Sequence, residues 1–279
     1  MMTAELYLGG RRVYYELHGS AGEPIVLLNG IMMSTASWRP FIESMTAQNR
    51  VILVDFFDQG NSERLEPGYD HGVQVELLEA VLAELAAKLG RESFNIMGIS
   101  YGGEVALQYA LAYPARVRRL VLANTCARTS PWLRKIGDGW NEVARSGSGL
   151  AYYLTTIPVI YSTRFFEEHA EWMEGREAAL TKYFSRPEVL AALIRLTDSS
   201  RDYDVTDRLH EITCPTLVIS SSEDALVPPT EQQLLHAGIR GSAYVTINGS
   251  GHASMYEAPE AFAALTVGFT NLPEKGIII

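Results

Sequence analysis

A serine lies at the centre of the segment Gly98-Ile99-Ser100-Tyr101-Gly102, between an apolar run at 94–97 and a helical pattern at 104–113. Glycines two residues before and after a serine, in a sharp turn from strand to helix, are typical of a nucleophile elbow. A Cβ at either glycine would collide with the neighbouring strand or helix. A serine hydroxyl is a poor nucleophile near neutral pH, so it needs a histidine base and a carboxylate that orients the histidine. Ser100 is therefore our candidate nucleophile for an acyl-transfer reaction.

His252 is the candidate base. The segment Gly249-Ser250-Gly251-His252 follows a predicted strand at 244–247, so His252 is expected at the carboxyl edge of the sheet together with Ser100. The other histidines lie in an early strand, near loops or within helical patterns, and are interpreted as surface or structural residues: His18, His71, His169, His210 and His236.

The candidate carboxylate is Asp224. A predicted strand at 216–219 continues into a segment that holds Glu223 and Asp224 before Ala-Leu-Val-Pro228. We prefer Asp224, whose shorter side chain is better fixed before an apolar turn with proline, and keep Glu223 as the alternative. The position after the predicted strand at 120–123 offers Asn124 rather than an acid.

Two backbone N–H groups are expected to stabilise the oxyanion of a tetrahedral intermediate. Tyr101 follows the nucleophile at the start of a helix, where the helix dipole adds to its effect. Ile31 lies in the loop Asn29-Gly30-Ile31-Met32 after a predicted strand at 24–28. Gly30 allows this loop to approach the nucleophile closely.

The elements that must position these residues alternate between strands and helices. Apolar runs typical of buried parallel strands occur at 24–28, 51–54, 94–97, 120–123 and 216–219. Leucines at 78, 82, 85 and 89 indicate a helix that ends at Gly90. A hairpin joined by Gly9-Gly10 is expected to open the fold at a sheet edge. This alternation predicts an α/β fold with helices on both faces of a parallel sheet.

The alternation stops between residues 127 and 209, where helical patterns occur without strand runs. We therefore predict core segments at 1–126 and 210–279, with a helical cap at 127–209 inserted between them. The insertion holds 11 of the 27 aromatic residues, with 11 basic and 12 acidic side chains. These aromatic residues either build the core of the cap or line an apolar acyl pocket beneath it.

Composition narrows the functional classes. The formal charge of −10 disfavours nucleic acid as a partner, and 47% hydrophobic residues indicate an ordinary globular protein. The two cysteines show no spacing typical of metal or redox sites, and no nucleotide-binding or zinc-protease motif occurs. We expect no cofactor and no metal. No signal-like or membrane-spanning apolar run occurs, so a cytoplasmic protein without membrane association is expected. The oligomeric state and the role of the apolar tail at 276–279 stay open.

The chain resembles the α/β-hydrolase superfamily over nearly its whole length. The resemblance rests on the 98–102 segment, on Asp224-Ala-Leu-Val-Pro228, on Gly251-His252, and on residues 55–62, which are similar to the D-x-x-x-x-G-x-S loop of that family. It implies a mostly parallel eight-stranded sheet and the chain order nucleophile, acid, histidine. Its general similarity is to lactonase-like and esterase-like members.

The oxyanion loop departs from the family pattern, because Asn29-Gly30 stands where most relatives have His-Gly. Residues 29–38 are similar to the matching loop of 3-hydroxyacyl acyltransferases.

We therefore predict a serine hydrolase that cleaves a small or medium apolar ester, thioester or lactone. Three alternatives stay open: an acyltransferase that passes a hydroxyacyl group to an alcohol, a hydrolase of carbon–carbon bonds, and a non-catalytic ligand-binding protein on the same scaffold.

Overall fold

One eight-stranded sheet runs through the part of the chain that the computed structural model describes, residues 2–66 and 68–273. Its strand order is β1-β2-β4-β3-β5-β6-β7-β8. The strands are β1 (Met2–Leu8), β2 (Arg11–His18), β3 (Glu23–Leu28), β4 (Asn49–Val54), β5 (Phe94–Ile99), β6 (Val117–Ala123), β7 (Thr216–Ser221) and β8 (Ala243–Ile247). β1 and β2 form the antiparallel hairpin at one edge, and β3 to β8 pair in parallel. The predicted fold class is confirmed; the tail at 276–279 lies outside the described residues.

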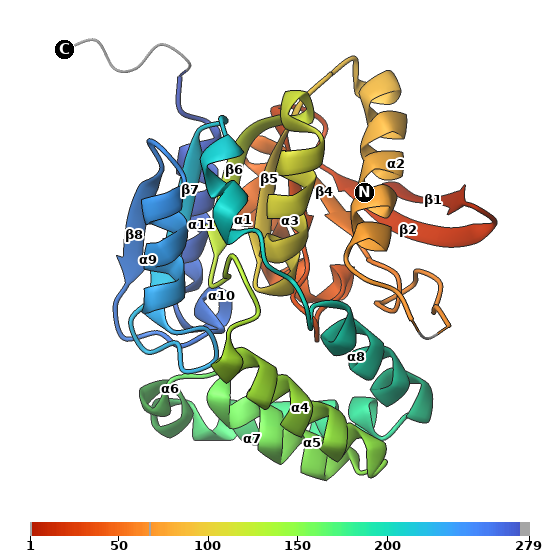
Figure 1. Cartoon of the computed structure of the whole chain (residues 1–279), viewed down its shortest axis with the longest axis vertical. Helices are drawn as coiled ribbons and strands as arrows, with labels where there is room; N and C mark the ends of the chain where they lie inside the picture. The colour runs from red at the N-terminus through yellow and green to blue at the C-terminus, as the bar shows by residue number, and fades with distance from the viewer. Residues whose placement is uncertain (1, 67, 274–279) are drawn as a thin grey trace.

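Helices cover both faces of the sheet, as Figure 1 shows. The α-helices are α1 (Ile42–Thr46), α2 (Gly72–Leu89), α3 (Tyr101–Ala112), α4 (Pro131–Arg145), α5 (Gly149–Thr156), α6 (Thr163–Glu168), α7 (Ala170–Phe184), α8 (Pro187–Ser199), α9 (Pro229–Gly238), α10 (Ser254–Glu257) and α11 (Pro259–Thr270). Short 3-10 helices are η1 (Thr35–Phe41), η2 (Pro114–Arg116), η3 (Ile157–Val159) and η4 (Thr206–Glu211). On one face, α2, α3 and α9 bury their apolar residues against the sheet; η1, α1 and α11 do so on the other.

The continuous apolar strands are buried because the sheet is covered on both sides. All six residues of β5 are buried from solvent, and so are five of the six residues in each of β3 and β4. α2 ends at Gly90, whose φ of 61° lies in the left-handed region that favours glycine. This packing brings the carboxyl ends of β3, β5, β6 and β7 to one edge, which is where open α/β sheets bind their ligands.

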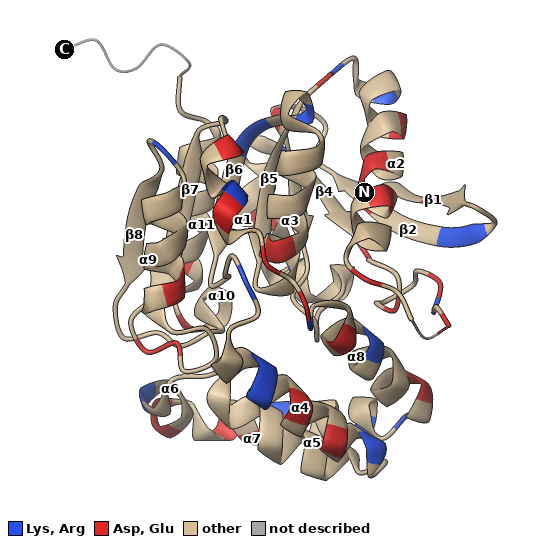
Figure 2. Ribbon diagram, in the orientation of Figure 1, with Lys and Arg blue, Asp and Glu red and all other residues tan. Residues whose placement is uncertain are grey.

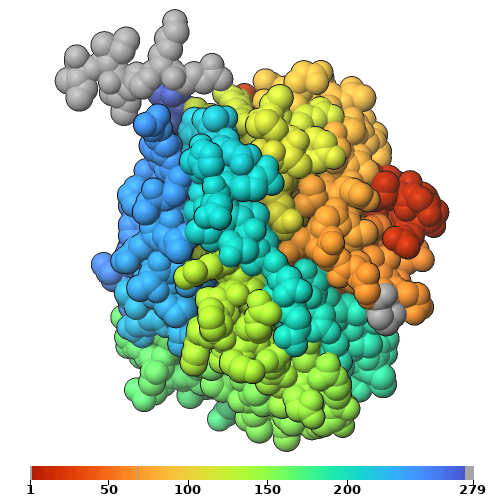
Figure 3. Space-filling view, viewed as in Figure 1, coloured from red at the N-terminus to blue at the C-terminus, as the bar shows by residue number. Residues whose placement is uncertain are grey.

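The helices α4 to α8 all lie between β6 and β7 in the chain and gather at that edge of the sheet. In Figure 3 they form a continuous layer that contacts both the N-terminal and the C-terminal part of the core. Buried residues such as Tyr152, Phe184 and Leu193 give these helices a core of their own. The boundaries at 127 and 209 stay a prediction; below, "the insertion" means residues 127–209.

Figure 2 shows charged residues of both signs scattered along the ribbon of the core and of α4 to α8. Within residues 2–66 and 68–273, no helix combines the length and the apolar character needed to cross a bilayer.

A buried ion pair joins the insertion to the core. Arg195 of α8 donates from Nε to Oδ2 of Asp58 at 3.0 Å and also contacts Oδ1, while the Asp58 side chain is fully buried. Tyr69 Oη donates to the same carboxylate at 2.7 Å. The hydrogen bond with Asp58 raises the pKa of the Arg195 guanidinium. Loss of one partner would leave a buried carboxylate without its counter-charge.

We predict that Arg195→Met lowers the free energy of unfolding by about 3 kcal/mol, measured by urea titration, because Asp58 stays buried without a cation. Arg145→Met is the matched control: Arg145 pairs with Glu142 at the surface, so its loss should cost less than about 0.5 kcal/mol. Equal losses in the two variants would contradict a structural role for the Arg195–Asp58 pair.

Candidate active site

Ser100 lies in a strained turn between β5 and α3. Its φ of 54° and ψ of −124° are unusual for a residue with a side chain. A Cβ at Gly98 would lie 2.3 Å from Gly102 O, and a Cβ at Gly102 would lie 2.4 Å from Leu28 O. Only glycine therefore fits at either position, and the turn directs the Ser100 side chain out of the sheet edge.

His252 lies beside Ser100, in the short segment between β8 and α10. Its Nε2 is 2.9 Å from Ser100 Oγ. Ala253 N donates to Ile160 O at 3.0 Å, so this segment is attached to the insertion. A Cβ at Gly251 would lie 2.6 Å from Ser162 N, which explains why glycine precedes the histidine.

Asp224 follows β7 and approaches the other nitrogen of His252. Its Oδ2 is 2.9 Å from His252 Nδ1, and its Oδ1 accepts hydrogen bonds from the backbone N–H groups of Leu226 and Val227, at 3.1 and 2.8 Å. Asp224 is 3% exposed, whereas the alternative acid, Glu223, is exposed to solvent. The structure thus brings Ser100, His252 and Asp224 into one hydrogen-bonded row.

Asn124, at the end of β6, also holds this carboxylate. Its Nδ2 donates to Asp224 Oδ2 at 3.0 Å, and its Oδ1 accepts from Ser254 Oγ at 2.7 Å. Its φ of 47° lies in the left-handed region, which asparagine tolerates better than most residues. From the sequence, Asn124 stood out only as a position that offers no acid. The available signal was an asparagine at the end of a strand adjacent to the strand that carries Asp224.

The two candidate oxyanion donors lie on either side of Ser100. A Cβ at Gly30 would be 3.5 Å from Ser100 Cβ, so the loop that carries Ile31 approaches the nucleophile closely. Among the described residues, neither Ile31 N nor Tyr101 N donates a hydrogen bond to the protein. Both N–H groups are therefore available to a bound molecule.

Asn29 is completely buried and braces the loop that follows it. Its Nδ2 donates to Val54 O and to Gln59 Oε1, and its Oδ1 accepts from Trp38 Nε1 at 2.7 Å. Gln59 Nε2 in turn donates to Gly30 O at 2.8 Å. This network joins Asn29, Gln59 and Trp38 and holds the loop in place. No role for Gln59 or Trp38 was predicted from the sequence.

The carboxylate of Asp55 organises the loop that carries Gln59. It accepts hydrogen bonds from Thr35 N at 2.7 Å and from Asn61 N at 2.9 Å, and burial raises the pKa of this carboxyl group.

The Tyr101 hydroxyl shares a hydrogen bond with Ser199 Oγ at 2.9 Å. Burial raises the pKa of this hydroxyl strongly, so it stays neutral.

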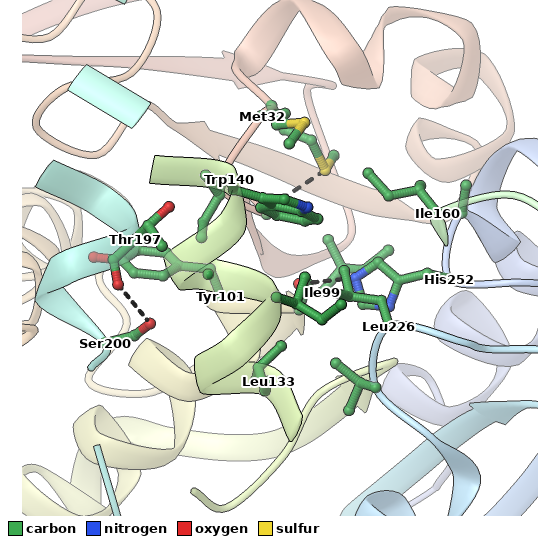
Figure 4. A pocket seen from close by; sticks show the side chains of 18 of the residues that line it. Met32, Ile99, Tyr101, Leu133, Trp140, Ile160, Thr197, Ser200, Leu226 and His252 are labelled. Carbon is green, nitrogen blue, oxygen red and sulfur yellow. Dashed lines mark hydrogen bonds between the residues drawn. The ribbon is translucent and has the colours of Figure 1, made fainter. Parts of the chain in front are cut away.

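A cavity of about 1230 Å³, including its opening to solvent, contains Ser100 and His252. Figure 4 shows the apolar side chains of Leu226, Ile160 and Trp140 around His252, with the hydroxyl-bearing Tyr101, Thr197 and Ser200 at the other side of the view. Of the 11 aromatic residues in the insertion, Trp140 and Tyr161 line the cavity. Tyr152, Tyr153 and Phe184 belong instead to the core of the insertion.

No group of three or more potential metal ligands occurs within residues 2–66 and 68–273.

Comparison with known proteins identifies the family. The family model described as the alpha/beta hydrolase fold matches residues 23–259. A protein of Azorhizobium caulinodans named "Putative carbamate hydrolase RutD" is 30% identical over 262 residues, which cover 94% of this chain and 96% of that protein.

Two solved structures extend this similarity. MGS-M2, an alpha/beta hydrolase enzyme from a Medee basin deep-sea metagenome library, superimposes with a TM-score of 0.93 at 46% identity, over 99% of this chain and all of that one. A thermophilic esterase from Thermogutta terrifontis gives a TM-score of 0.80 at 27% identity, over 95% and 96% of the two chains. The chain therefore belongs to the α/β-hydrolase fold family and is a hydrolase of that fold.

Proposed function

We propose that the chain is a serine hydrolase that cleaves a small or medium-sized apolar ester, thioester or lactone through an acyl-enzyme. The main observation that supports this is the hydrogen-bonded row in which Ser100 Oγ and Asp224 Oδ2 each lie 2.9 Å from a ring nitrogen of His252. Both distances are within hydrogen-bond reach, as a general base and the group that orients it require.

In the first half of the reaction, Ser100 Oγ attacks the carbonyl carbon while His252 Nε2 takes the hydroxyl proton. Asp224 accepts a hydrogen bond from His252 Nδ1–H, which fixes the tautomer and stabilises the imidazolium. The N–H groups of Ile31 and Tyr101 stabilise the oxyanion of the tetrahedral intermediate. When the bond to the leaving alcohol or thiol breaks, His252 returns the proton to it, and the acyl group remains on Ser100.

In the second half, a water molecule replaces the leaving group. His252 takes a proton from the water as its oxygen attacks the acyl carbon, and a second oxyanion forms in the same place. Collapse of this intermediate releases the carboxylic acid and returns the proton to Ser100 Oγ. The enzyme is regenerated without a co-reactant.

The lining of the cavity supports an acyl substrate with an apolar part. Leu133, Ile136, Trp140, Leu226 and Val227 lie around Ser100 and His252, and burial of a substrate against them removes apolar surface from water. The names of the relatives, "Putative carbamate hydrolase RutD" and a thermophilic esterase, both describe hydrolysis at a carbonyl carbon that is bonded to a heteroatom.

Water is favoured over an alcohol as the acyl acceptor. The acyltransferase alternative rested on the Asn29 loop, but the Asn29 side chain is used within the core to brace that loop. It does not line the cavity and therefore gives no support to an acceptor site. The relatives named above are hydrolases.

We predict that Ser100→Ala abolishes covalent labelling by a fluorophosphonate probe, because the alanine has no oxygen to attack phosphorus. Labelling is measured by intact-protein mass spectrometry. Ser220→Ala is the matched control, since Ser220 is a buried serine of β7 that bonds Gln232, and it should label like the wild type. Undiminished labelling of Ser100→Ala would remove the proposed nucleophile.

We also predict that Asp224→Asn lowers kcat for a 4-nitrophenyl ester by up to about 10⁴-fold, because an amide stabilises the wrong histidine tautomer. Glu223→Gln, at the exposed neighbouring position, should leave kcat unchanged. The assignment of the acid fails if the Glu223 variant is the one that loses activity.

A further inference from the structure

Three arginine side chains line the cavity, and two of them have carboxylate partners. Arg134 contacts Asp202 at 3.2 Å, and Arg201 contacts Asp138 at 2.6 Å. Within residues 2–66 and 68–273, no carboxylate oxygen lies within 4.0 Å of Arg176. The charge of Arg176 is thus not neutralised by a contact within the described chain.

Arg176 is surrounded by aromatic rings instead of acids. Its guanidinium carbon is 4.7 Å from the ring centroid of Tyr256, 5.2 Å from that of Trp172 and 5.8 Å from that of Tyr161. Ring faces attract a cation without cancelling its charge. Arg176 Nε is buried and has no hydrogen-bond partner among the described residues.

The rings of Tyr161, Trp172 and Tyr256 form an aromatic cage around Arg176. This cage borders the cavity that contains the candidate nucleophile. Arg176, Tyr161 and Tyr256 line the cavity that contains Ser100 and His252. Tyr256 lies in α10, four residues after His252, and its hydroxyl donates to Ser37 O at 3.3 Å. A group bound at Arg176 would therefore share the cavity with a carbonyl group bound at Ser100.

The acidic residue next to the cage, Glu257, does not form an ion pair with Arg176. Glu257 follows Tyr256, but its carboxylate accepts hydrogen bonds from Ser162 N, Ser162 Oγ and Gly251 N, at 3.1, 2.5 and 3.1 Å. These bonds attach the His252 segment to the insertion. The cage is left with one cation, apolar ring faces and one buried N–H donor, Arg176 Nε, that has no partner among the described residues.

We infer that Arg176 binds a carboxylate of the substrate, so that the preferred substrates are esters or lactones with a free carboxylate at a distance from the carbonyl that is attacked. The guanidinium fork suits the two oxygens of a carboxylate. This inference rests on the proposed hydrolase function and assigns Arg176 as a residue that determines specificity.

The test compares two 4-nitrophenyl esters of the same shape, the half-ester of hexanedioic acid and the ester of 6-methylheptanoic acid. We expect Arg176→Gln to lower kcat/KM for the anionic ester by about 10- to 100-fold, the cost of one charged hydrogen-bonded contact, and to change the neutral ester by less than about threefold. Arg176→Lys, which keeps the charge but not the fork, should retain part of the preference.

Arg186→Gln is the matched control, because Arg186 also lies over an aromatic ring, 4.3 Å from the ring centroid of Tyr183, but does not line the cavity. It should leave the ratio of the two kcat/KM values within about threefold of the wild type. An equal loss for both esters in Arg176→Gln would show that Arg176 only holds the insertion in place and would overturn the inference, as would an unchanged ratio.

A binding measurement separates this inference from the proposed function. Isothermal titration of Ser100→Ala with the monomethyl ester of hexanedioic acid should give a Kd that rises about 10- to 100-fold when Arg176→Gln is added. If the wild type hydrolyses neither nitrophenyl ester but this difference in Kd appears, the proposed hydrolysis fails and the carboxylate site stands. Equal Kd values would reject the site.

Discussion

The left-handed backbone at Ser100 is the constraint on which the rest of the site depends. A non-glycine residue in such a conformation costs about 1–3 kcal/mol, and the cost is sustained only where the surroundings fix the chain. Here β5 supplies that support through its parallel pairing with β3 and β6, and Ser100 N donates to Ala123 O at 2.9 Å. Because the sheet fixes the turn, the position of Ser100 is fixed as well. The other segments of the site must therefore bring their side chains to Ser100.

The segments that carry these side chains are themselves held in place by buried hydrogen bonds. Asn124 bonds both Asp224 and Ser254, so it couples the carboxylate to the helix that follows His252. Gln59 braces the loop that carries Ile31 in the same way, through Asn29 and Gly30. Positioning of this kind contributes to catalysis because the dipoles are already oriented before the substrate arrives. The strained turn and its braces therefore form one rigid unit.

Much of this architecture could be predicted from the sequence because it depends on local patterns. Continuous apolar runs indicated the parallel strands, Gly90 marked the end of α2, and the glycines around Ser100 indicated the turn. The predicted order of elements then placed Asp224 and His252 at the same sheet edge as Ser100. These inferences need only that parallel strands end at a common edge.

The remaining parts could not be predicted because they depend on contacts between distant segments. Asn124 and Asp224 are 100 positions apart, and Gln59 meets Gly30 only when β3 and β4 pair. The aromatic content of the insertion indicated a packed core or a pocket lining, and the structure contains both, with Tyr152 in the core and Tyr161 at the cavity. The isolation of Arg176 from acids depends on how α7 packs against α10, which no local pattern encodes.

The most direct test of the central claim is the identity of the residue that carries the acyl group during turnover. The enzyme is mixed with a 4-nitrophenyl ester, quenched in acid within the first turnover, digested and analysed by mass spectrometry. We expect the acyl mass on the peptide that contains Ser100, in an amount that matches the initial burst of nitrophenol. Continued turnover with an unmodified Ser100 at every quench time, or an acyl group on a different residue, would contradict the account.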